Sequence, residues 1–296
     1  MKVALVYDRV NKWGGAESVL LALHDLWPEA PLYTSVYDKE ATPWADVFDV
    51  RTSFLQKLPL PKTAHEYYPY LMGIAFESFD FDAYDLVISV THEFAKAIIT
   101  KPKTYHLCYC LNPVGYLWSG FHDYFLGKSD FFKAITAPLI SYLRWYDGIV
   151  AQRPDQYLAI SKTVQARIKK YYCRNSDVIY PPVNLSMEKT QKGGDKFFLI
   201  VSRLAAEKRL DLAIAAFNKL GWPLKIIGVG REGDRLKKKA KGNIKFLGHL
   251  TDGERNRYYK SCQAVIIPGV EDFNLVAVEA QSFGKPVVAL NAGGVT

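Results

Sequence analysis

The sequence predicts an α/β protein with two domains, each built on a sheet of parallel strands. Its 296 residues, 49% of them hydrophobic, can bury a large core and are long for a single domain. Short β-branched runs alternate along the chain with segments whose apolar residues recur at helical spacing. A polar, glycine-bearing segment at 187–195, MEKTQKGGD, follows two prolines and is typical of an interdomain linker. We therefore expect domains at 1–184 and 185–296.

The first domain begins with an apolar strand and a glycine-bearing loop that leads into a helix. Apolar runs predict its strands at 3–7, 32–37, 48–50, 84–90, 106–111, 157–160 and 178–180. A helix is expected after the loop at 11–15, and another over Lys162–Tyr172, where Ser161 is a suitable N-cap. The proline-punctuated stretch 51–81 has no clean period, so we expect it to be irregular with short helices.

The second domain repeats the alternation of strands and helices. Its predicted strands are 197–201, 224–228, 245–248, 264–267 and 286–290. Its predicted helices are 207–219, 231–241, 251–261 and 274–283.

The sequence argues against a membrane-spanning, a secreted and a zinc-binding protein. No run approaches the ~18 apolar residues of a membrane span, and Asp8 comes too early for a signal peptide, so a cytoplasmic location is expected. The four cysteines match neither zinc spacing nor a disulfide framework, and we expect them to be reduced.

The net charge of +8 is unevenly distributed along the chain. Residues 1–184 hold 19 Lys and Arg against 19 Asp and Glu, whereas residues 185–296 hold 19 against 11. The basic run at 231–245 is either a solvated helix face or a surface that attracts an anionic donor or an anionic membrane. Nucleic acid is not expected as a partner, because this run lacks interleaved aromatic residues.

The strongest candidate site lies in the second domain, where strands end in charged loops. Glu271 and Asp272 follow the strand at 264–267, and Glu279 lies about two turns into the next helix. Arg203 and Lys208 follow the strand at 197–201. Two cations and a helix N-terminus at the carboxyl edge of a parallel sheet suit a nucleoside diphosphate. The alternative is that Glu271 and Asp272 merely favour the dipole of the helix, while Glu279 is a solvated surface residue.

Four further residues are candidates with simpler alternatives. Gly14 and Gly15 permit positive φ and close approach to a ligand, or form an ordinary tight turn. His92 follows the strand at 84–90, where a site residue would project, although a single histidine is more often structural. Gly228 lies in a Gly-x-Gly turn, which alone is a weak signal.

Four motifs in order along the chain resemble family 4 of the retaining glycosyltransferases, in the branch similar to bacterial mannosyltransferases of O-antigen and polysaccharide assembly. They are Gly14-Gly15-Ala16-Glu17, Tyr180-Pro181-Pro182-Val183, Ser202-Arg203 through Lys208, and Glu271-Asp272-Phe273 through Glu279-Ala280. The resemblance implies the GT-B fold, in which two Rossmann-like domains face each other across a cleft. The first domain would bind the acceptor and the second the nucleotide-sugar.

The resemblance also assigns roles. Arg203 and Lys208 would stabilise the departing diphosphate, Glu271 and His92 would contact the donor sugar, and Glu279 would hold the ribose. Donor contacts are also expected from Gly14, Gly15, Gly228, Leu247, Asp272, Phe273, Asn274 and Leu275. The implied reaction moves a hexose, with mannose expected, from a donor such as GDP-mannose to a saccharide or polyprenyl-linked acceptor in cell-surface polysaccharide synthesis. No metal and no cofactor are expected, because Asp80-Phe81-Asp82 precedes a strand rather than following one.

The sequence departs from the resembled pattern at three places. Leu111 stands where many relatives carry a histidine, Gly115 lies where an arginine is often found, and relatives continue beyond Thr296. The second domain is therefore expected to be truncated and incomplete. These departures keep open a non-catalytic nucleotide-sugar-binding or scaffold protein. A sugar-nucleotide epimerase would need a denser set of acids and histidines.

Aromatic residues are concentrated between Tyr105 and Tyr146, which hold 12 of the 41 in the chain. Leu139, Leu143 and Tyr146 at helical spacing favour core packing for part of this run. An apolar acceptor groove or a surface peripheral to the inner membrane face is the other interpretation.

Overall fold

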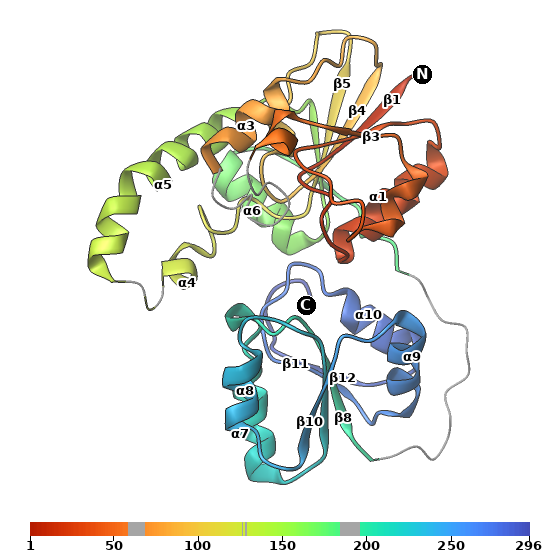
Figure 1. Cartoon of the computed structure of the whole chain (residues 1–296), viewed down its shortest axis with the longest axis vertical. Coiled ribbons are helices and arrows are strands. Elements are labelled where there is room, and N and C mark those ends of the chain that lie inside the picture. The colour runs from red at the N-terminus through yellow and green to blue at the C-terminus, as the bar shows by residue number, and fades with distance from the viewer. Residues whose placement is uncertain (59–68, 126, 128, 184–195) are drawn as a thin grey trace. The chain divides into compact units, whose positions relative to one another are not determined.

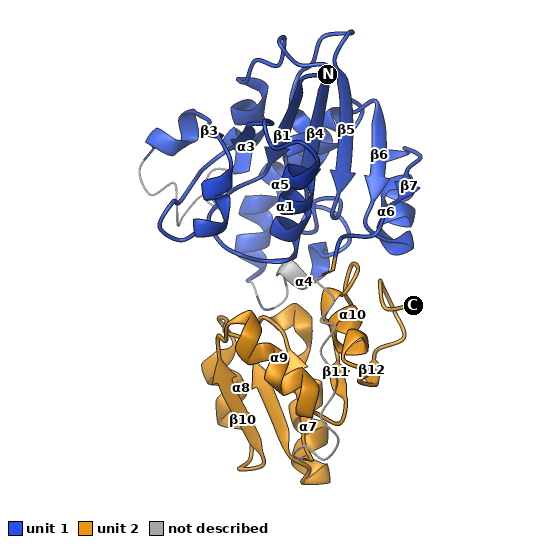
Figure 2. Ribbon diagram, turned by 90° about the vertical axis from the view of Figure 1, so that its right-hand side faces the viewer, with its two compact units in different colours: residues 1–182 blue, residues 183–296 orange. Residues whose placement is uncertain are grey.

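A computed structural model describes residues 1–58, 69–125, 127, 129–183 and 196–296. The chain divides into two compact units, Met1–Pro182 and Val183–Thr296 (Figure 2). The expected linker at 187–195 lies outside the described residues, as does part of the stretch 51–81.

Unit 1 contains a seven-stranded parallel sheet (Figure 1). Its strands are β1 Val3–Tyr7, β2 Leu32–Thr34, β3 Val50–Thr52, β4 Leu86–Thr91, β5 Tyr105–Cys110, β6 Gln156–Ala159 and β7 Asp177–Val178. They lie in the order β3-β2-β1-β4-β5-β6-β7. The strand order reverses between β1 and β4, and this reversal is the switch point where α/β sheets bind ligands.

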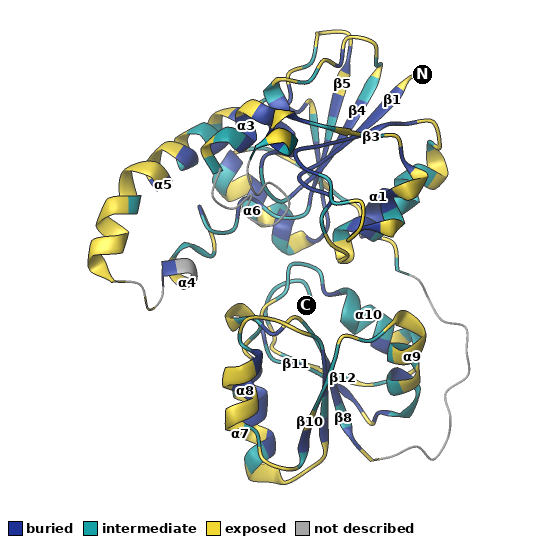
Figure 3. Ribbon diagram, in the orientation of Figure 1, coloured by how far each residue is buried: buried dark blue, intermediate teal, exposed yellow. Residues whose placement is uncertain are grey.

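The central strands of unit 1 are apolar along their whole length because helices cover both faces of a parallel sheet. All five residues of β1 are buried, and β4 is buried from Val87 onward (Figure 3). The helices are α1 Gly15–Leu26, α3 Pro69–Glu77, α4 Phe121–Phe125, α5 Asp130–Val150 and α6 Lys162–Tyr172, with 3-10 turns η1 Pro43–Val47, η2 Phe54–Lys57 and η4 Ala95–Ala97.

Unit 2 contains a five-stranded parallel sheet in the order β10-β9-β8-β11-β12. Its elements are β8 Phe198–Val201, η5 Ala206–Lys208, α7 Leu210–Leu220, β9 Leu224–Ile227, α8 Gly233–Lys239, β10 Ile244–Gly248, α9 Asp252–Ser261, β11 Val265–Ile267, α10 Leu275–Ser282 and β12 Val287–Ala289. The switch point lies between β8 and β11. Two apolar clusters, one around Ile214 and Leu224 and the other around Leu199 and Tyr259, form the core.

The predicted α/β class and the two parallel sheets are confirmed. Helix α6 has the predicted bounds, and the Ser161 hydroxyl caps it by accepting a hydrogen bond from the Val164 amide at 3.1 Å. The helix predicted at 207–219 begins later, because 206–208 forms a 3-10 turn and Arg209 adopts the left-handed conformation at φ 51°. This difference places Lys208 in a turn at the edge of the sheet.

None of the helices in the described part of the chain has the length and apolar character needed to cross a membrane. The four cysteines are free thiols, and only Cys173 among them is exposed.

Candidate functional site

The switch point of unit 2 is occupied by a cation and a carboxylate. Lys208 lies in the turn after β8, and Glu271 lies in the loop after β11. The Lys208 Nζ donates a hydrogen bond to Glu271 Oε2 at 2.6 Å, and the two side chains are 15% and 23% exposed. These residues are 63 positions apart in the sequence, and the neighbouring strands β8 and β11 bring them together.

A glycine makes this approach possible. A Cβ atom at Gly269 would lie 2.9 Å from both the carbonyl carbon and the carbonyl oxygen of Lys208, closer than real Cβ atoms come to backbone. The loop after β11 therefore passes directly against the turn that carries Lys208. The short distance between Lys208 and Glu271 follows from this contact between the two backbones.

Arg203, the other predicted cation of this edge, has a different carboxylate partner. Its guanidinium lies 3.4 Å from Glu207, and both side chains are more than half exposed. Exposed ion pairs of this kind are weak, so the guanidinium can leave Glu207 at little cost. Arg203 and Lys208 thus lie in one loop with separate partners, and their joint binding of a diphosphate stays a prediction.

Gly228 has a structural role in the loop after β9. Its φ of 136° is unfavourable for other residues, and a Cβ there would lie 1.9 Å from the Ser202 carbonyl oxygen. Backbone hydrogen bonds from Ser202 to Ile227 and from Leu204 to Val229, both 3.0 Å, join the two loops. The glycine therefore allows the Arg203 loop to pack against its neighbour, and a donor contact at Gly228 stays a prediction.

The start of α10 is built by Asn274, which has φ 82° and caps the helix by accepting from the Ala277 amide at 2.9 Å. Leu275 is the first helical residue, one position after the predicted start of this helix at 274. Asp272 and Phe273 lie in the loop between Glu271 and this cap. Helix α10 thus begins four residues after Glu271, and the positive end of its dipole lies on the same loop as the carboxylate that binds Lys208.

Glu279 is held by α9. It accepts from the Tyr259 hydroxyl at 2.8 Å and from Arg255 at 3.5 Å. Burial, together with the charge of Glu279, raises the pKa of Tyr259 far above its ordinary value, so this hydroxyl remains a donor. Glu279 is therefore fixed between α9 and α10 rather than solvated, and its predicted contact with a ribose is untested. Leu247, in β10, packs against the second apolar cluster of unit 2.

Sequence reasoning missed the glycine pair that follows β12. The Gly294 amide donates to the Glu271 carbonyl at 2.7 Å, and Cβ atoms at Gly293 and Gly294 would lie 2.5 and 2.4 Å from the carbonyl oxygens of Glu271 and Asp272. These two residues lie directly against the acidic loop. A Gly-Gly pair just after a predicted strand was the available signal.

The switch point of unit 1 carries a second cluster of charged residues. Asp8, after β1, is fully buried and accepts from the Thr91 hydroxyl and the Ala95 amide, both at 2.8 Å. It also accepts from the His92 and Glu93 amides at 2.8 and 3.1 Å, and lies 3.2 Å from His92 Nδ1. One carboxylate therefore organises the whole turn after β4.

The charges of this cluster shift the acidity of both partners. Burial alone would raise the pKa of Asp8, but the hydrogen bond and charge of His92 and the backbone donors outweigh it, so the pKa lies well below its usual value. Burial would lower the pKa of His92, but its hydrogen bond to Asp8 and the charges of Asp8 and Glu93 raise it. The Nδ1 atom faces Asp8 and the Nε2 atom faces Arg9 at 3.3 Å.

Arg9 completes this cluster through a two-pronged contact with Glu93, at 2.9 and 2.7 Å. His92 was singled out from the sequence, whereas Asp8, Arg9 and Glu93 were missed as site residues. The signal was present, because a charged pair directly after a buried strand is unusual unless something holds it.

The Gly14 and Gly15 loop differs from expectation. Gly14 is extended, with φ −170°, and Gly15 begins α1, so the expectation of positive φ is wrong. A Cβ at Gly14 would lie 3.1 Å from Glu17 Oε2, and Glu17 is buried with its Oε1 accepting from the Tyr7 hydroxyl at 2.8 Å. The inward position of the Glu17 carboxylate accounts for a small residue at position 14.

Comparison with known proteins places this geometry in context. Residues 184–296 match the family model described as Glycosyl transferases group 1. An uncharacterized glycosyltransferase of Methanocaldococcus jannaschii is 26% identical over 51% of this chain and 44% of its own length. D-rhamnosyltransferase WbpZ of Pseudomonas aeruginosa is 27% identical over 53% of this chain and 44% of its own. Human alpha-1,3/1,6-mannosyltransferase ALG2 is 24% identical over 76% and 60%. The chain spans about half the length of the first two of these relatives.

Solved structures share the fold across the whole chain. Anabaena Alr3699/HepE, in complex with UDP and glucose, has a TM-score of 0.71 and 20% identity, covering 100% of this chain and 82% of that one. Sucrose-phosphate synthase from Thermosynechococcus elongatus has a TM-score of 0.69 and 14% identity, covering 100% and 83%. The chain therefore has the α/β fold of the GT-B glycosyltransferases, as the motifs predicted.

Proposed function

We propose that this protein is a retaining glycosyltransferase that moves a hexose from a nucleotide-sugar to an acceptor hydroxyl. The observation that carries the proposal is the Lys208–Glu271 pair at the switch point of unit 2, within the segment that matches the glycosyltransferase family model. Switch points are where α/β sheets bind nucleotides. These similarities do not favour the non-catalytic alternative.

Lys208 is proposed to bind the donor diphosphate. Its ammonium group is held by Glu271 in a partly buried position at the carboxyl edge of the sheet, so part of its desolvation cost has already been met. An entering diphosphate would take over the ammonium group, and the exposed guanidinium of Arg203 would leave Glu207 to join it. Both cations would then stabilise negative charge as the bond from the anomeric carbon to the diphosphate oxygen breaks.

Glu271 is proposed to hold the hydroxyl groups of the donor sugar. Once Lys208 turns to the phosphates, the Glu271 carboxylate loses its partner and can accept hydrogen bonds from the sugar. A carboxylate beside a diphosphate would otherwise repel it, so the lysine has to lie between them. Asp272, Phe273, Asn274 and Leu275 would supply backbone groups at the N-terminus of α10, and Glu279 would bind the ribose.

In unit 1, His92 is proposed to contact the donor sugar, with Asp8 as a positioning residue. Asp8 fixes the Nδ1 atom, which leaves Nε2 as the atom available to a hydroxyl once Arg9 gives way. Gly14 and Gly15 are proposed to present backbone amides to the phosphates.

The donor is proposed to be GDP-mannose, and the acceptor a saccharide or polyprenyl-linked saccharide at the cytoplasmic face of a membrane, in polysaccharide synthesis. The similarity to the human mannosyltransferase ALG2 supports mannose, whereas the HepE complex contains UDP and glucose, so both bases enter the test. Reaction without metal or cofactor is also proposed. Asp80 and Asp82 lie ahead of β4, at the opposite edge of the sheet from the switch point, and Asp82 binds Lys101.

The proposal is tested by incubating the protein with GDP-mannose or UDP-glucose and measuring release of the nucleoside diphosphate, with and without a polyprenyl-linked acceptor. We expect release that depends on the acceptor and that Glu271→Gln abolishes. Steady release without any acceptor dependence, or no release with either donor while the nucleotide still binds, would contradict a transferase.

A further inference from the structure

The first half of helix α5 is apolar and exposed. Between Asp130 and Arg144 the only charged residue is Lys133. Large side chains that are at least 39% exposed recur along the whole helix, and they are Phe131, Phe132, Ile135, Leu139, Tyr142, Trp145 and Ile149. At 100° per residue these seven positions fall within an arc of about 140° on one face. Monomeric soluble proteins seldom expose so continuous an apolar face.

The two halves of α5 are held differently. The second half is anchored, because Asp147 binds the buried Lys96 ammonium group and the Trp118 indole, both at 2.7 Å, and Tyr146 donates to Glu77 at 2.9 Å. The first half extends away from the sheet of unit 1 and is exposed along most of its length, as Figure 3 shows. This half contributes Ile140 and Leu143 to the core, whereas its exposed apolar side chains lie outside the core.

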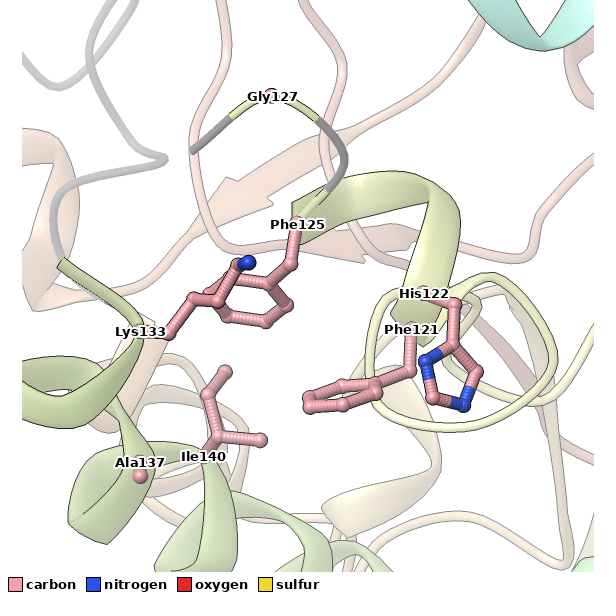
Figure 4. A pocket seen from close by; sticks show the side chains of 7 residues that line it. All are labelled: Phe121, His122, Phe125, Gly127, Lys133, Ala137 and Ile140. Carbon is pink, nitrogen blue, oxygen red and sulfur yellow. The ribbon is translucent and has the colours of Figure 1, made fainter. Parts of the chain in front are cut away.

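The same half of α5 has a second apolar surface, on the side that faces α4. A cavity of about 370 Å³ lies there, lined mainly by Phe121, Phe125, Ala137 and Ile140, with Lys133 at its edge. Figure 4 shows the rings of Phe121 and Phe125 and the side chain of Ile140 directed into it. The segment thus presents apolar surface on two sides at once.

We propose that the first half of α5, with α4 beside it, inserts into the interfacial region of a lipid bilayer. A helix that is apolar on more than one side is stable only when surrounded by core or by lipid. A rigid protein surface would contact the outward face alone, whereas lipid can lie against that face and also send an acyl chain into the cavity.

The length and composition of the segment agree with an interfacial position. The run from Phe131 to Leu143 is much shorter than the ~20 apolar residues needed to span a bilayer, which is typical of a segment that lies in the interface. Tyr142 and Trp145 are amphipathic residues that suit the boundary between acyl chains and headgroups. Lys133 at the cavity edge complements a lipid phosphate.

This attachment would be driven by apolar insertion rather than by charge. The first 184 residues have equal numbers of acidic and basic side chains, so unit 1 carries no excess that would draw it to an anionic surface. Binding should therefore occur on electrically neutral vesicles and should persist at high salt. The inference stands apart from the transferase reaction, because it rests only on α4 and α5.

The test is flotation of the whole chain with vesicles of phosphatidylcholine, at low salt and at about 0.5 M salt. We expect the protein to float at both salt concentrations. The double variant Phe131→Ser with Ile135→Ser should partition into the vesicles about a hundredfold less, because each apolar side chain that no longer enters the lipid costs about tenfold. Leu26→Ser and Leu212→Ser remove other exposed apolar side chains, from α1 and α7, and should leave partitioning unchanged. All four positions are on the surface, so unchanged thermal unfolding is the expected folding control.

Several results would overturn the inference. These are no flotation of the wild-type protein, equal flotation of the double variant, or binding that needs anionic lipid and disappears at high salt. A dimer in sedimentation that the double variant abolishes, without vesicle binding, would instead identify a second copy as the occupant. Calorimetric affinity for GDP, measured on the same variants, should not change in any case, so failure of this inference is distinguishable from failure of the proposed function.

Discussion

Replacing Asp8 by asparagine tests the cluster at the switch point of unit 1. The Asp8 carboxylate has no exposed surface and accepts hydrogen bonds from one hydroxyl and three backbone amides, besides its contact with His92. An asparagine would turn an NH₂ group toward some of these donors and would leave His92 and its neighbours without the negative charge. Breaking a buried charged pair typically costs about 3 to 5 kcal/mol, and we expect unit 1 to be destabilised by that amount.

The pH dependence of stability should change with the same substitution. The pKa of Asp8 is lowered in the folded protein, so its contribution is present above the ordinary value of 3.8 and is lost as pH falls through the folded pKa. The pKa of His92 is raised, so its contribution is present below 6.5 and is lost as pH rises through the folded pKa. The wild-type protein should therefore lose stability above pH 6.5 as His92 loses its proton. In the Asp8→Asn variant the free energy of unfolding should depend less on pH.

Urea unfolding followed by tryptophan fluorescence measures this effect, because five of the six tryptophans lie in unit 1. The matched control is Asp85→Asn, an exposed aspartate that accepts from the Lys2 amide at 2.7 Å at the other edge of the same sheet. The control should cost less than about 1 kcal/mol. Equal stability of the Asp8 and Asp85 variants, or an unchanged pH profile in Asp8→Asn, would refute the role given to Asp8.

Three further predictions concern single positions. Gly269→Ala should destabilise unit 2 by about 1 to 3 kcal/mol and weaken nucleotide binding, because its Cβ would press on the Lys208 backbone. Calorimetry should show no loss of stability or of nucleotide affinity for Gly253→Ala, where a Cβ meets nothing within 4 Å. Glu271→Gln should lower turnover far more than affinity for the bare nucleoside diphosphate, and equal losses would point to a structural role. Ser161→Ala should cost about 1 kcal/mol through the lost cap of α6, whereas unchanged urea unfolding would show that the cap is dispensable.

The sheets could be predicted from the sequence because a buried parallel strand consists of a continuous run of apolar residues. VALVY at β1 and LVISV within β4 are such runs, and the helix at Lys162–Tyr172 is marked by both its periodicity and its cap. Similar apolar runs predicted β8 and β11. Together with β4, these strands placed Lys208, Glu271 and His92 just after strand ends. Local patterns therefore located the carboxyl edges where the candidate sites lie.

The partners of these residues could not be predicted, because they come from distant parts of the chain. Asp8 and His92 are 84 positions apart, and the sequence around His92 does not indicate that the Asp8 carboxylate binds it. The Tyr259 hydroxyl that binds Glu279 comes from another helix. The arginine expected near position 115 is missing from that segment, yet Arg167 of α6 reaches Asn112 at 2.9 Å. Tertiary packing, rather than local sequence, decides each of these contacts.

The sequence left open whether the aromatic-rich run that includes α5 packs in the core or forms an exposed apolar surface. The spacing of Leu139, Leu143 and Tyr146 favoured a core helix, and Leu143 is indeed buried, but the neighbouring positions face outward. Periodicity identifies an apolar face without stating whether anything covers it.

The most direct test of the central claim is calorimetric binding of GDP and UDP to the wild-type chain and to Lys208→Ala, with Lys219→Ala as the control. Lys219 lies in the last turn of α7, at the opposite edge of the unit 2 sheet from Lys208. A charge-assisted contact is worth about 1.5 to 3 kcal/mol, so Lys208→Ala should bind the preferred nucleotide about tenfold more weakly or worse, while the control stays within about twofold. Equal affinity of Lys208→Ala and the wild-type protein would contradict a nucleotide site at this switch point.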